Sequence, residues 1–367
     1  NDMRNRYIPQ LAVTQNMGIR FERGFEMKAA IYQGPKQMTI EEIKRPSIGP
    51  DQILVQVKAS GVCGTDVKTY IRGHRFFEPP CILGHEFAGV VAEVGSEVTD
   101  YSPGDRVAVA PYVPCGFCHM CQAGHFELCY DKSGVESGAF TEYIAIPKEV
   151  IERGTVRLPT GMSFSAGAMA EPLACVLNGI EDCRLELGDT LLIMGAGPMG
   201  LLSAQAAFAQ GAGKVIISEF NQERLAKAAE IGAIAVDPRK EDLKEVLKRE
   251  TGGKLAQAVM VCVGFAEAVE EAQQYVAPGG VINMFGGLPK DSKVTIDPGL
   301  IHYQQVSLVG SFGFTHIQYR RAVELMANKR IDAERIITHT LPLEEAEKGI
   351  NLSVEQKALK VMLVNEG

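Results

Sequence analysis

The chain has 367 residues, 46% of them hydrophobic and 22% charged, which excludes a largely disordered protein and predicts two domains. Lys and Arg total 37 against 45 Asp and Glu, a formal net charge of −8, and no basic block is present. Nucleic acid is therefore not expected as a partner. Because we find neither a bilayer-length apolar run nor a secretory signal, we expect a cytoplasmic protein with no membrane partner.

The elements along the chain change in character near residue 172. Residues 1–26 hold four Arg without clear periodicity, and we interpret them as an N-terminal extension or cloning remnant. Residues 27 to about 150 predict short strands separated by Gly and Pro, the first opening at Met27 and others at 53–58, 89–94 and 106–110. After residue 190, strands alternate with helices, which is typical of a doubly wound parallel sheet. The strands are expected at 191–194, 214–218, 258–262 and 280–285, and the helices at 199–210 and 222–231.

The last fifty residues break this alternation, with helices expected near 318–328 and 343–352 and a final strand at 360–364. We expect 281–285 to be the last strand of the parallel sheet, with an exposed edge suited to pairing between subunits.

Four cysteines, Cys115, Cys118, Cys121 and Cys129, form the pattern C-x2-C-x2-C-x7-C. Four thiolates on one short loop can close a tetrahedron around Zn²⁺ and leave no open position, which indicates a structural zinc site. An iron–sulfur cluster is a weaker alternative. Gly116 and Gly124 supply the sharp turns that such a loop needs.

A dinucleotide fingerprint lies at 195–200, where GAGPMG follows a predicted strand and opens a predicted helix. In this context Gly195 permits the tight turn, Gly197 lets a pyrophosphate approach the backbone, and Gly200 allows close packing of helix on strand. The helix N-terminus, which opens with Pro198 and Met199, offers free N–H groups to the phosphates from Met199 onward.

Glu219 ends the second strand of this unit, nineteen residues after Gly200. A carboxylate there accepts hydrogen bonds from the adenosine ribose hydroxyls and repels a 2′-phosphate, which favours NAD over NADP. Arg224 is a further candidate beside the adenine.

Three other segments each carry a metal-capable residue beside Gly or Pro: GVCGTD at 61–66, GHE at 84–86 and EPL at 171–173. Taken singly, Cys63, His85 and Glu171 are more simply explained as core or surface residues. Their meaning depends on their occurring together.

In chain order, GVCGTD, GHEFAGVV, the four-cysteine loop, GDRVAV, EPLAC and GAGPMG resemble the zinc-dependent medium-chain dehydrogenase/reductase family. The resemblance is to its polyol and threonine dehydrogenase branch and extends from Met27 to the C-terminus. It implies an α/β protein in which a GroES-like, β-rich catalytic domain (27–172 and 312–367) is interrupted by a Rossmann NAD-binding domain (173–311). It also implies a homodimer or homotetramer.

The resemblance implies two zinc ions per chain, one structural and one catalytic. Cys63 and His85 would be catalytic zinc ligands, with Glu86 and Glu171 filling the other positions, one directly and one through a water. Thr65 matches the position whose hydroxyl accepts the substrate proton, and Asp66 would orient His85. Bound zinc would polarise the substrate oxygen while hydride passes to nicotinamide.

The proton path is left open by the sequence. Many relatives carry His three residues after Thr65, where this chain has Lys68. Either Lys68 relays the proton, or the proton leaves through the cofactor ribose and water, and we favour the second route.

The substrate is also open. Gly313-Phe314 replaces an Arg-Tyr pair of animal sorbitol dehydrogenases, so we expect a secondary alcohol such as a polyol or sugar alcohol without naming sorbitol. Arg72, His74 and Arg75 suggest a sugar phosphate as one possibility. The alternatives are an L-threonine 3-dehydrogenase activity and, in another class, a non-catalytic protein that binds NAD and zinc.

Overall fold

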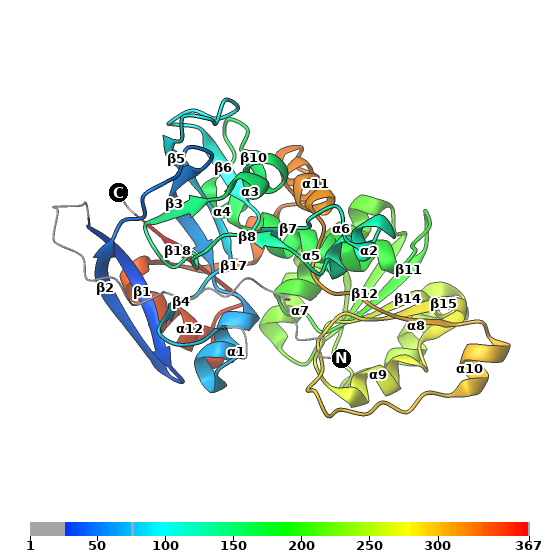
Figure 1. Cartoon of the computed structure of the whole chain (residues 1–367). Coiled ribbons are helices and arrows are strands. Elements are labelled where there is room, and N and C mark those ends of the chain that lie inside the picture. The colour runs from blue at the N-terminus through cyan, green and yellow to red at the C-terminus, as the bar shows by residue number, and fades with distance from the viewer. Residues whose placement is uncertain (1–25, 75–76, 366–367) are drawn as a thin grey trace. The chain divides into compact units, whose positions relative to one another are not determined.

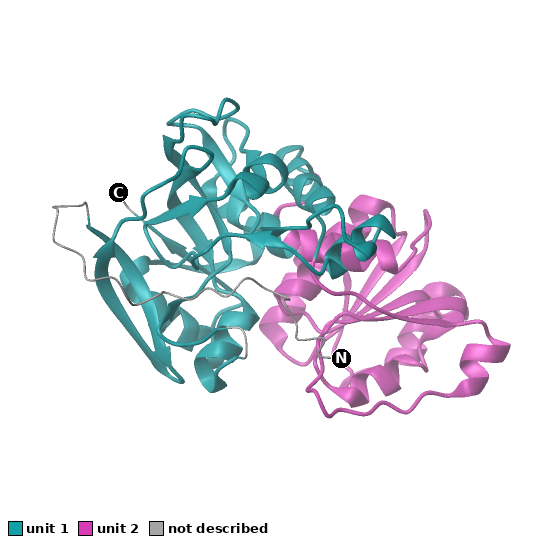
Figure 2. Cartoon of the chain, viewed as in Figure 1, with its two compact units in different colours: residues 1–172, 314–329, 333–367 teal, residues 173–313, 330–332 magenta. Residues whose placement is uncertain are grey.

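The computed structural model describes residues 26–74 and 77–365, and these form two compact units (Figure 2). The first contains residues 26–74, 77–172, 314–329 and 333–365, and the second contains 173–313 and 330–332. The interpretation of 1–26 as an extension falls outside the described residues except at Glu26, and Arg75 also lies outside them.

The first unit is rich in β-structure (Figure 1). Its largest sheet has the order β10-β6-β5-β3-β18-β17, with β9 also paired to β3, and a smaller sheet has the order β2-β1-β4. The strands are β1 (Glu26–Gly34), β2 (Gln37–Lys44), β3 (Ile53–Gly61), β4 (Cys81–Ile82), β5 (Glu86–Val94), β6 (Arg106–Val109), β7 (Tyr112–Val113), β8 (Ser133–Gly134), β9 (Tyr143–Ile146), β10 (Thr155–Arg157), β17 (Ile337–Pro342) and β18 (Lys360–Val364).

The core of this unit forms because the strands turn alternate apolar side chains inward. Ile53, Val55 and Val57 of β3 are buried with Phe87 of β5 and Val107 of β6. The helices of the unit are α1 (Gly64–Arg72), α2 (His119–Gln122), α3 (Lys148–Gly154), α4 (Phe164–Ala168), α11 (His316–Ala327) and α12 (Ala346–Val354), with 3-10 turns η1 (Phe126–Leu128), η2 (Ala333–Ile336) and η3 (Leu343–Glu345).

The second unit is built on a parallel sheet in the order β13-β12-β11-β14-β15-β16. In chain order this is 3-2-1-4-5-6, the doubly wound arrangement, so the predicted fold class is confirmed. Its elements are α5 (Ala170–Asp182, which begins in the first unit), β11 (Thr190–Met194), α6 (Pro198–Gln210), β12 (Lys214–Ser218), α7 (Gln222–Glu230), β13 (Ile234–Val236), α8 (Leu243–Thr251), β14 (Ala256–Val261), α9 (Ala266–Ala272), β15 (Val276–Met284), α10 (Pro298–Tyr303) and β16 (Ser307–Gly310).

Every residue of β11 is buried, as expected for the central strand of a parallel sheet with both faces covered. The order of strands reverses between β11 and β14, and ligands of such sheets bind beyond the carboxyl ends of the strands at that reversal.

Two expectations need correction. The segment 281–285 is not the last strand, because β16 pairs in parallel with β15 and forms the edge. Moreover, β15 begins at Val276 rather than 280, with a shift of register against β14 where Gly279 takes a φ of +77°.

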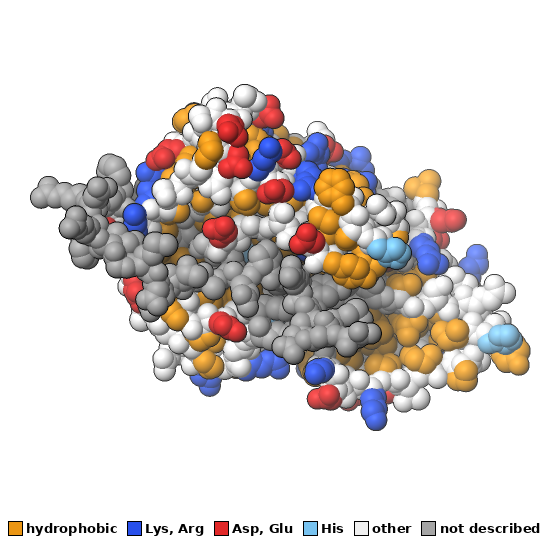
Figure 3. Space-filling view, in the orientation of Figure 1, with side chains coloured by type: hydrophobic (Ala, Val, Ile, Leu, Met, Phe, Trp, Pro, Cys, Tyr) orange, Lys and Arg blue, Asp and Glu red, His pale blue; other side chains and the backbone are white. Residues whose placement is uncertain are grey.

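Surface charge is mixed on the face shown in Figure 3, where acidic and basic side chains are interspersed over the first unit and Lys and Arg side chains gather near α11. None of the helices within 26–74 and 77–365 is long and apolar enough to cross a membrane.

Candidate active site and metal centres

Cys63 occupies the N-cap position of α1. Its sulfur accepts a hydrogen bond from Thr65 N at 3.5 Å, and its own N–H donates to Asp66 Oδ2 at 2.9 Å, which completes a capping box. The N-terminus of α1 and the amide donor both place partial positive charge beside this sulfur. The local sequence GVCGTD therefore holds the sulfur at the start of a helix.

Asp66 connects α1 to the segment before β5. Its carboxylate is fully buried, and its Oδ1 accepts a hydrogen bond from Gly84 N at 3.1 Å and lies 3.6 Å from His85 Nδ1. Gly84 has a φ of +88°, and a Cβ there would meet the ring of Phe140 at 2.5 Å, so only glycine fits. With Nδ1 turned to Asp66, the other ring nitrogen of His85 is left for a ligand.

The electrostatic surroundings of His85 favour a cation. Burial lowers its pKa, but the negative charges of Cys63 and Asp66 more than compensate, and the pKa of His85 lies well above its usual value. Surroundings that stabilise positive charge on an imidazole also suit a metal cation.

Glu86 begins β5 and forms an ion pair with Lys360 of β18, both side chains being almost completely buried. Lys360 Nζ also donates to Val62 O at 3.0 Å. A Cβ at Gly61 would come within 2.0 Å of Glu86 Oε2, so a larger residue there would displace the carboxylate of this pair. The sequence analysis missed Lys360, although a lone Lys at the head of the apolar run KVMLV was a usable signal.

Ligand atoms of Cys63, His85 and Glu86 all lie within 4.8 Å of one another. A thiolate, an imidazole and a carboxylate make a donor set that fits Zn²⁺, and three protein ligands with one open position are typical of catalytic zinc.

Glu171, the second residue of α5, is also buried but does not belong to this group. Its negative charge still acts on Lys360 and on Tyr319, so it lies in the same interior region.

Tyr319, on α11, is a further buried residue of this region that the sequence analysis did not single out. It is 1% exposed, and its hydroxyl has no hydrogen-bond partner in the described part of the chain. Burial and the charge of Glu171 raise the pKa of Tyr319 well above its usual value. In the sequence it is indistinguishable from a core aromatic of an amphipathic helix.

The four sulfurs of the cysteine loop converge. Neighbouring Sγ atoms are separated by 3.5 Å (Cys115–Cys129), 3.6 Å (Cys118–Cys121), 3.8 Å (Cys118–Cys129) and 4.0 Å (Cys115–Cys121). A tetrahedral site with Zn–S bonds of about 2.3 Å requires sulfurs about 3.8 Å apart. The loop therefore fits a zinc ion with all four positions filled by protein.

Backbone N–H groups support the thiolates of this loop. Cys118 N donates to Cys115 Sγ at 3.3 Å, and Asp131 N donates to Cys129 Sγ at 3.4 Å. Backbone donors of the same kind lower the pKa of Cys118 to about 6. Gly116 and Gly124 both have a φ of +85°, which accounts for the glycines in the loop.

The glycine fingerprint lies between β11 and α6. Gly195 has a φ of +105°, and a Cβ on Gly200 would come within 2.0 Å of Gly195 O, so both positions require glycine for the fold. Gly197, the N-cap residue of α6, has nothing within 4 Å of its missing Cβ. The space beside Gly197 is therefore not filled by protein atoms. It adjoins the free N–H groups of Met199 and Gly200 in the first turn of α6, where a pyrophosphate would bind.

Glu219 follows β12 beside that loop. Its Oε2 accepts from Ala196 N at 2.9 Å, and its Oε1 accepts from Phe220 N at 2.7 Å and Asn221 N at 3.0 Å. Arg224 Nη1 lies 3.9 Å from Glu219 Oε2, so this arginine faces the carboxylate. Backbone donors therefore hold Glu219 next to the fingerprint.

Arg239 is a residue near this site that the sequence analysis missed. It forms an ion pair with Asp237 at 2.8 Å and lies 5.3 Å from the centre of the Phe220 ring. It is distant in sequence from the fingerprint, and only the pairing of β12 with β13 brings it close.

Two family models match the chain: the alcohol dehydrogenase GroES-like domain over 49–159 and the zinc-binding dehydrogenase model over 198–328. The chain belongs to the zinc-dependent medium-chain alcohol dehydrogenase family. It is therefore a zinc-dependent oxidoreductase that transfers hydride between an alcohol and a nicotinamide dinucleotide.

Among relatives with assigned activities, the sorbitol dehydrogenase of Bacillus subtilis is 31% identical over 92% of this chain and 97% of its own length. The L-threonine 3-dehydrogenase of Bacillus velezensis is 32% identical over 93% and 99%. The D-arabitol-phosphate dehydrogenase of Enterococcus avium is 32% identical over 92% and 97%.

Two solved structures illustrate the cofactor. A zinc-binding dehydrogenase of Sinorhizobium meliloti bound to NADP is 34% identical, with a TM-score of 0.85 over 93% of this chain and 99% of that one. An alcohol dehydrogenase of Escherichia coli in complex with NADH is 28% identical, with a TM-score of 0.83 over 93% and 100%. The relatives thus include proteins solved with each form of the cofactor.

Proposed function

We propose that this dehydrogenase oxidises a secondary hydroxyl group of a polyol or sugar alcohol to a ketone, with NAD as the hydride acceptor. The observation that carries the proposal is the group of Cys63, His85 and Glu86, whose ligand atoms lie within 4.8 Å of one another. In the reaction the carbinol hydrogen leaves as hydride to NAD⁺ and the hydroxyl hydrogen leaves as a proton.

We infer that Cys63, His85 and one carboxylate hold the catalytic zinc, and that the loop of Cys115, Cys118, Cys121 and Cys129 holds a structural zinc. When bound, the catalytic ion acts as a Lewis acid toward the substrate oxygen. Asp66 fixes the orientation of His85 from behind, since its Oδ1 lies 3.6 Å from Nδ1.

Of the two candidate carboxylates, Glu171 is the better proposal for the direct ligand. Glu86 is already neutralised by the buried ammonium of Lys360, and an ion pair of this kind is costly to break. We infer that Glu86 serves through this pair, or through a water, while Glu171 supplies the remaining ligand.

For the proton, we propose that the hydroxyl of Thr65 accepts it from the substrate. Thr65 is half-buried and its N–H is bonded to Cys63 Sγ, which holds it beside that sulfur. The side chain of Lys68 is exposed to solvent on the same helix, which supports the route through the cofactor ribose and water over a relay by Lys68.

The preference for NAD over NADP is likewise a proposal. It rests on Glu219, whose carboxylate is held by backbone donors beside the fingerprint and would repel a 2′-phosphate. Gly195, Gly197 and Gly200 would surround the pyrophosphate, with Pro198 and Met199 opening the helix above it. Arg224 faces Glu219 and would reinforce its position.

Three classes of substrate are candidates for this dehydrogenase. A polyol is favoured by the sorbitol dehydrogenase relatives, a sugar phosphate by the arabitol-phosphate dehydrogenase and by Arg72 and His74, and L-threonine by the third relative. We also propose a homodimer or homotetramer, in which the edge strand β16 would take the pairing role first expected for 281–285.

The test follows NADH formation by the zinc-loaded protein with NAD and a panel of polyols, sugar phosphates and L-threonine. We expect turnover of one group, lost in Cys63→Ser and on chelation of zinc but retained in the control Cys175→Ser, which changes a cysteine outside the ligand set. If the protein binds NAD but forms no NADH with any substrate of the panel, the proposal is contradicted and the non-catalytic alternative is favoured.

A further inference from the structure

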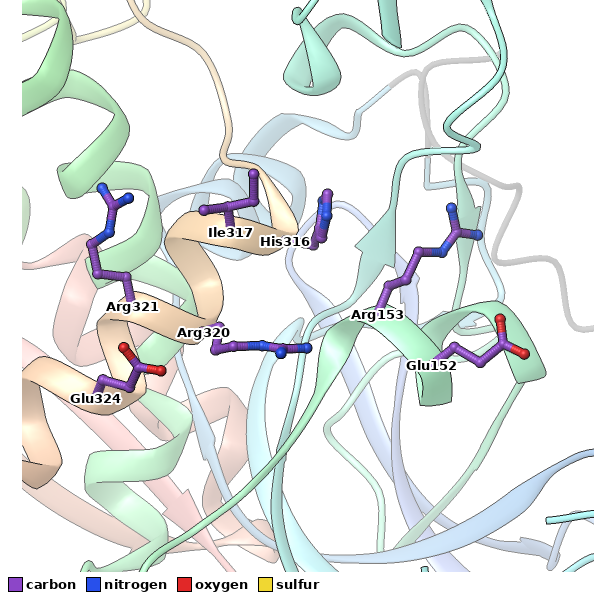
Figure 4. Close-up of a pocket in the computed structure, with 7 residues that line it drawn as sticks. All are labelled: Glu152, Arg153, His316, Ile317, Arg320, Arg321 and Glu324. Atoms are coloured by element: carbon purple, nitrogen blue, oxygen red, sulfur yellow. The ribbon is translucent and has the colours of Figure 1, made fainter. Parts of the chain in front are cut away.

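A charged cavity of about 540 Å³ lies between α3 and α11, both in the first unit (Figure 4). Helix α3 contributes Glu152 and Arg153, and α11 contributes His316, Arg320, Arg321 and Glu324. None of these residues belongs to the metal groups or to the cofactor site described above.

Two side chains in this cavity each carry a buried nitrogen without a hydrogen-bond partner in the described part of the chain. The Nε of Arg153 and the Nδ1 of His316 are buried without a hydrogen-bond partner. Arg320 has no carboxylate within ion-pair distance among the same residues. Buried polar atoms are normally satisfied, so these two nitrogens, with the exposed guanidinium of Arg320 beside them, indicate a partner that comes from outside the chain.

The arrangement of the side chains separates the positive groups from the negative ones. In Figure 4, Arg320 extends from α11 toward α3, with His316 above it and Arg153 on the opposite wall. Glu324 lies on the far side next to Arg321, and Glu152 lies beyond Arg153. The middle of the cavity is therefore positive, and the carboxylates stand at its two ends.

The titration of His316 agrees with this field. Burial lowers its pKa, and the positive charges of Arg153 and Arg320 lower it further. Both guanidinium groups therefore act on the same imidazole, and an anion bound among the three would reverse their effect.

We propose that this cavity binds the phosphate group of a small phosphorylated metabolite, held by Arg153, His316 and Arg320. Guanidinium groups match phosphate oxygens in charge and in geometry, and two of them face each other here across one hollow. The volume exceeds that of a phosphate alone and lies within the range of small-molecule sites, so it accommodates an organic part as well.

The site adjoins the cysteine loop. Arg153 Nη1 donates to Pro114 O at 2.5 Å, immediately before Cys115, and the His316 ring packs edge-on against Phe126 at 5.5 Å. A ligand held by Arg153 and His316 would thus contact the two side chains that brace this loop. This inference is independent of the identity of the oxidised alcohol.

The experiment uses the full chain, loaded with zinc and free of cofactor so that nothing turns over. Inorganic phosphate and ribose 5-phosphate are titrated separately at ionic strength held constant with chloride, and the imidazole signals of the seven His residues are followed by NMR. The His316 signal is assigned with His316→Gln. We expect a saturable change at His316 and a rise in its pKa.

Two variants decide the result. Arg320→Gln, at an exposed position, should weaken binding about tenfold or more, whereas the control Arg249→Gln on α8 should leave it unchanged. Tighter binding of ribose 5-phosphate would assign the site to an organic phosphate, and equal affinity would assign it to phosphate itself. No saturable change at His316, a change confined to His85, or equal affinity of the two variants would overturn the proposal.

Discussion

Glu86 and Lys360 form a buried ion pair although 274 residues separate them in the sequence. The pair joins β5 to β18, and its Glu86 is also a member of the group formed with Cys63 and His85. It ties the C-terminal strand of the chain to the candidate zinc site near its beginning, so the integrity of that site depends on both ends of the first unit.

Replacing one partner of this pair should destabilise the protein strongly. In Glu86→Gln the ammonium of Lys360 stays buried without its counter-charge, which should lower the free energy of unfolding by about 3–5 kcal/mol. The control is Lys348→Gln, which removes an exposed pair with Glu345 and should cost about 0–1 kcal/mol. Urea unfolding of the zinc-loaded proteins measures both. Equal costs for the two variants would mean that the buried pair is not needed for the fold.

Glu219 should decide which cofactor binds. Glu219→Gln removes the charge that would face the ribose, so the Kd for NAD should rise by about tenfold or more. The ratio of the Kd for NADP to the Kd for NAD should fall at the same time. Glu223→Gln, four residues on and exposed, is the matched control. Fluorescence titration with NADH and NADPH gives both constants. Unchanged discrimination in Glu219→Gln would remove the basis for preferring NAD.

Replacing two glycines of the fingerprint by alanine should have different effects, one on stability and the other on NAD binding. Gly200→Ala forces a Cβ to within 2.0 Å of Gly195 O and should destabilise the second unit, whereas Gly197→Ala meets no protein atom within 4 Å and should fold normally. We expect Gly197→Ala to lose NAD affinity, because the new methyl group fills the space that the pyrophosphate needs. Thermal unfolding and NAD titration separate the two effects. A Gly197→Ala variant that binds NAD normally would contradict this account of the loop.

The role of Thr65 is tested by shape-matched substitutions. Thr65→Val keeps the branched side chain but removes the hydroxyl, and kcat should fall by about 10²–10⁴-fold, while Thr65→Ser should retain most activity. Lys68→Ala should leave the pH dependence of hydride transfer unchanged, since Lys68 is exposed and outside the proposed route. A shifted pH profile in Lys68→Ala would instead identify Lys68 as the relay.

Removal of zinc should make one cysteine of the loop reactive. With a pKa of about 6, Cys118 is mostly thiolate at pH 7, so after chelation it should be alkylated first, and its rate should fall as the pH drops below 6. Buried Cys81 and Cys183 have pKa values raised to about 11 and about 12 and should stay unreacted in the folded protein. Iodoacetamide labelling read by peptide mass spectrometry follows each site. Protection of Cys118 after complete chelation would contradict the reactive thiolate expected at this position.

The features that the sequence determined by itself are local ones. The turn of GAGPMG between an apolar strand and a helix and the spacing of the four cysteines each depend on residues a few positions apart. Their geometry follows from glycine conformations, helix capping and short loop lengths, which neighbouring residues dictate. For the same reason the alternation of strands and helices after residue 190 was sufficient to predict the parallel sheet.

The contacts between segments far apart in the sequence were decided only by the tertiary structure. Lys360 beside Glu86, Arg239 over Phe220, and β16 outside β15 all arise from strand order and register, which are set by packing of the whole core. The cavity between α3 and α11 likewise combines Arg153 with Arg320 across a gap of more than a hundred residues. A sequence specifies such contacts only through the sum of many weak, non-local burial terms, and no short pattern records them.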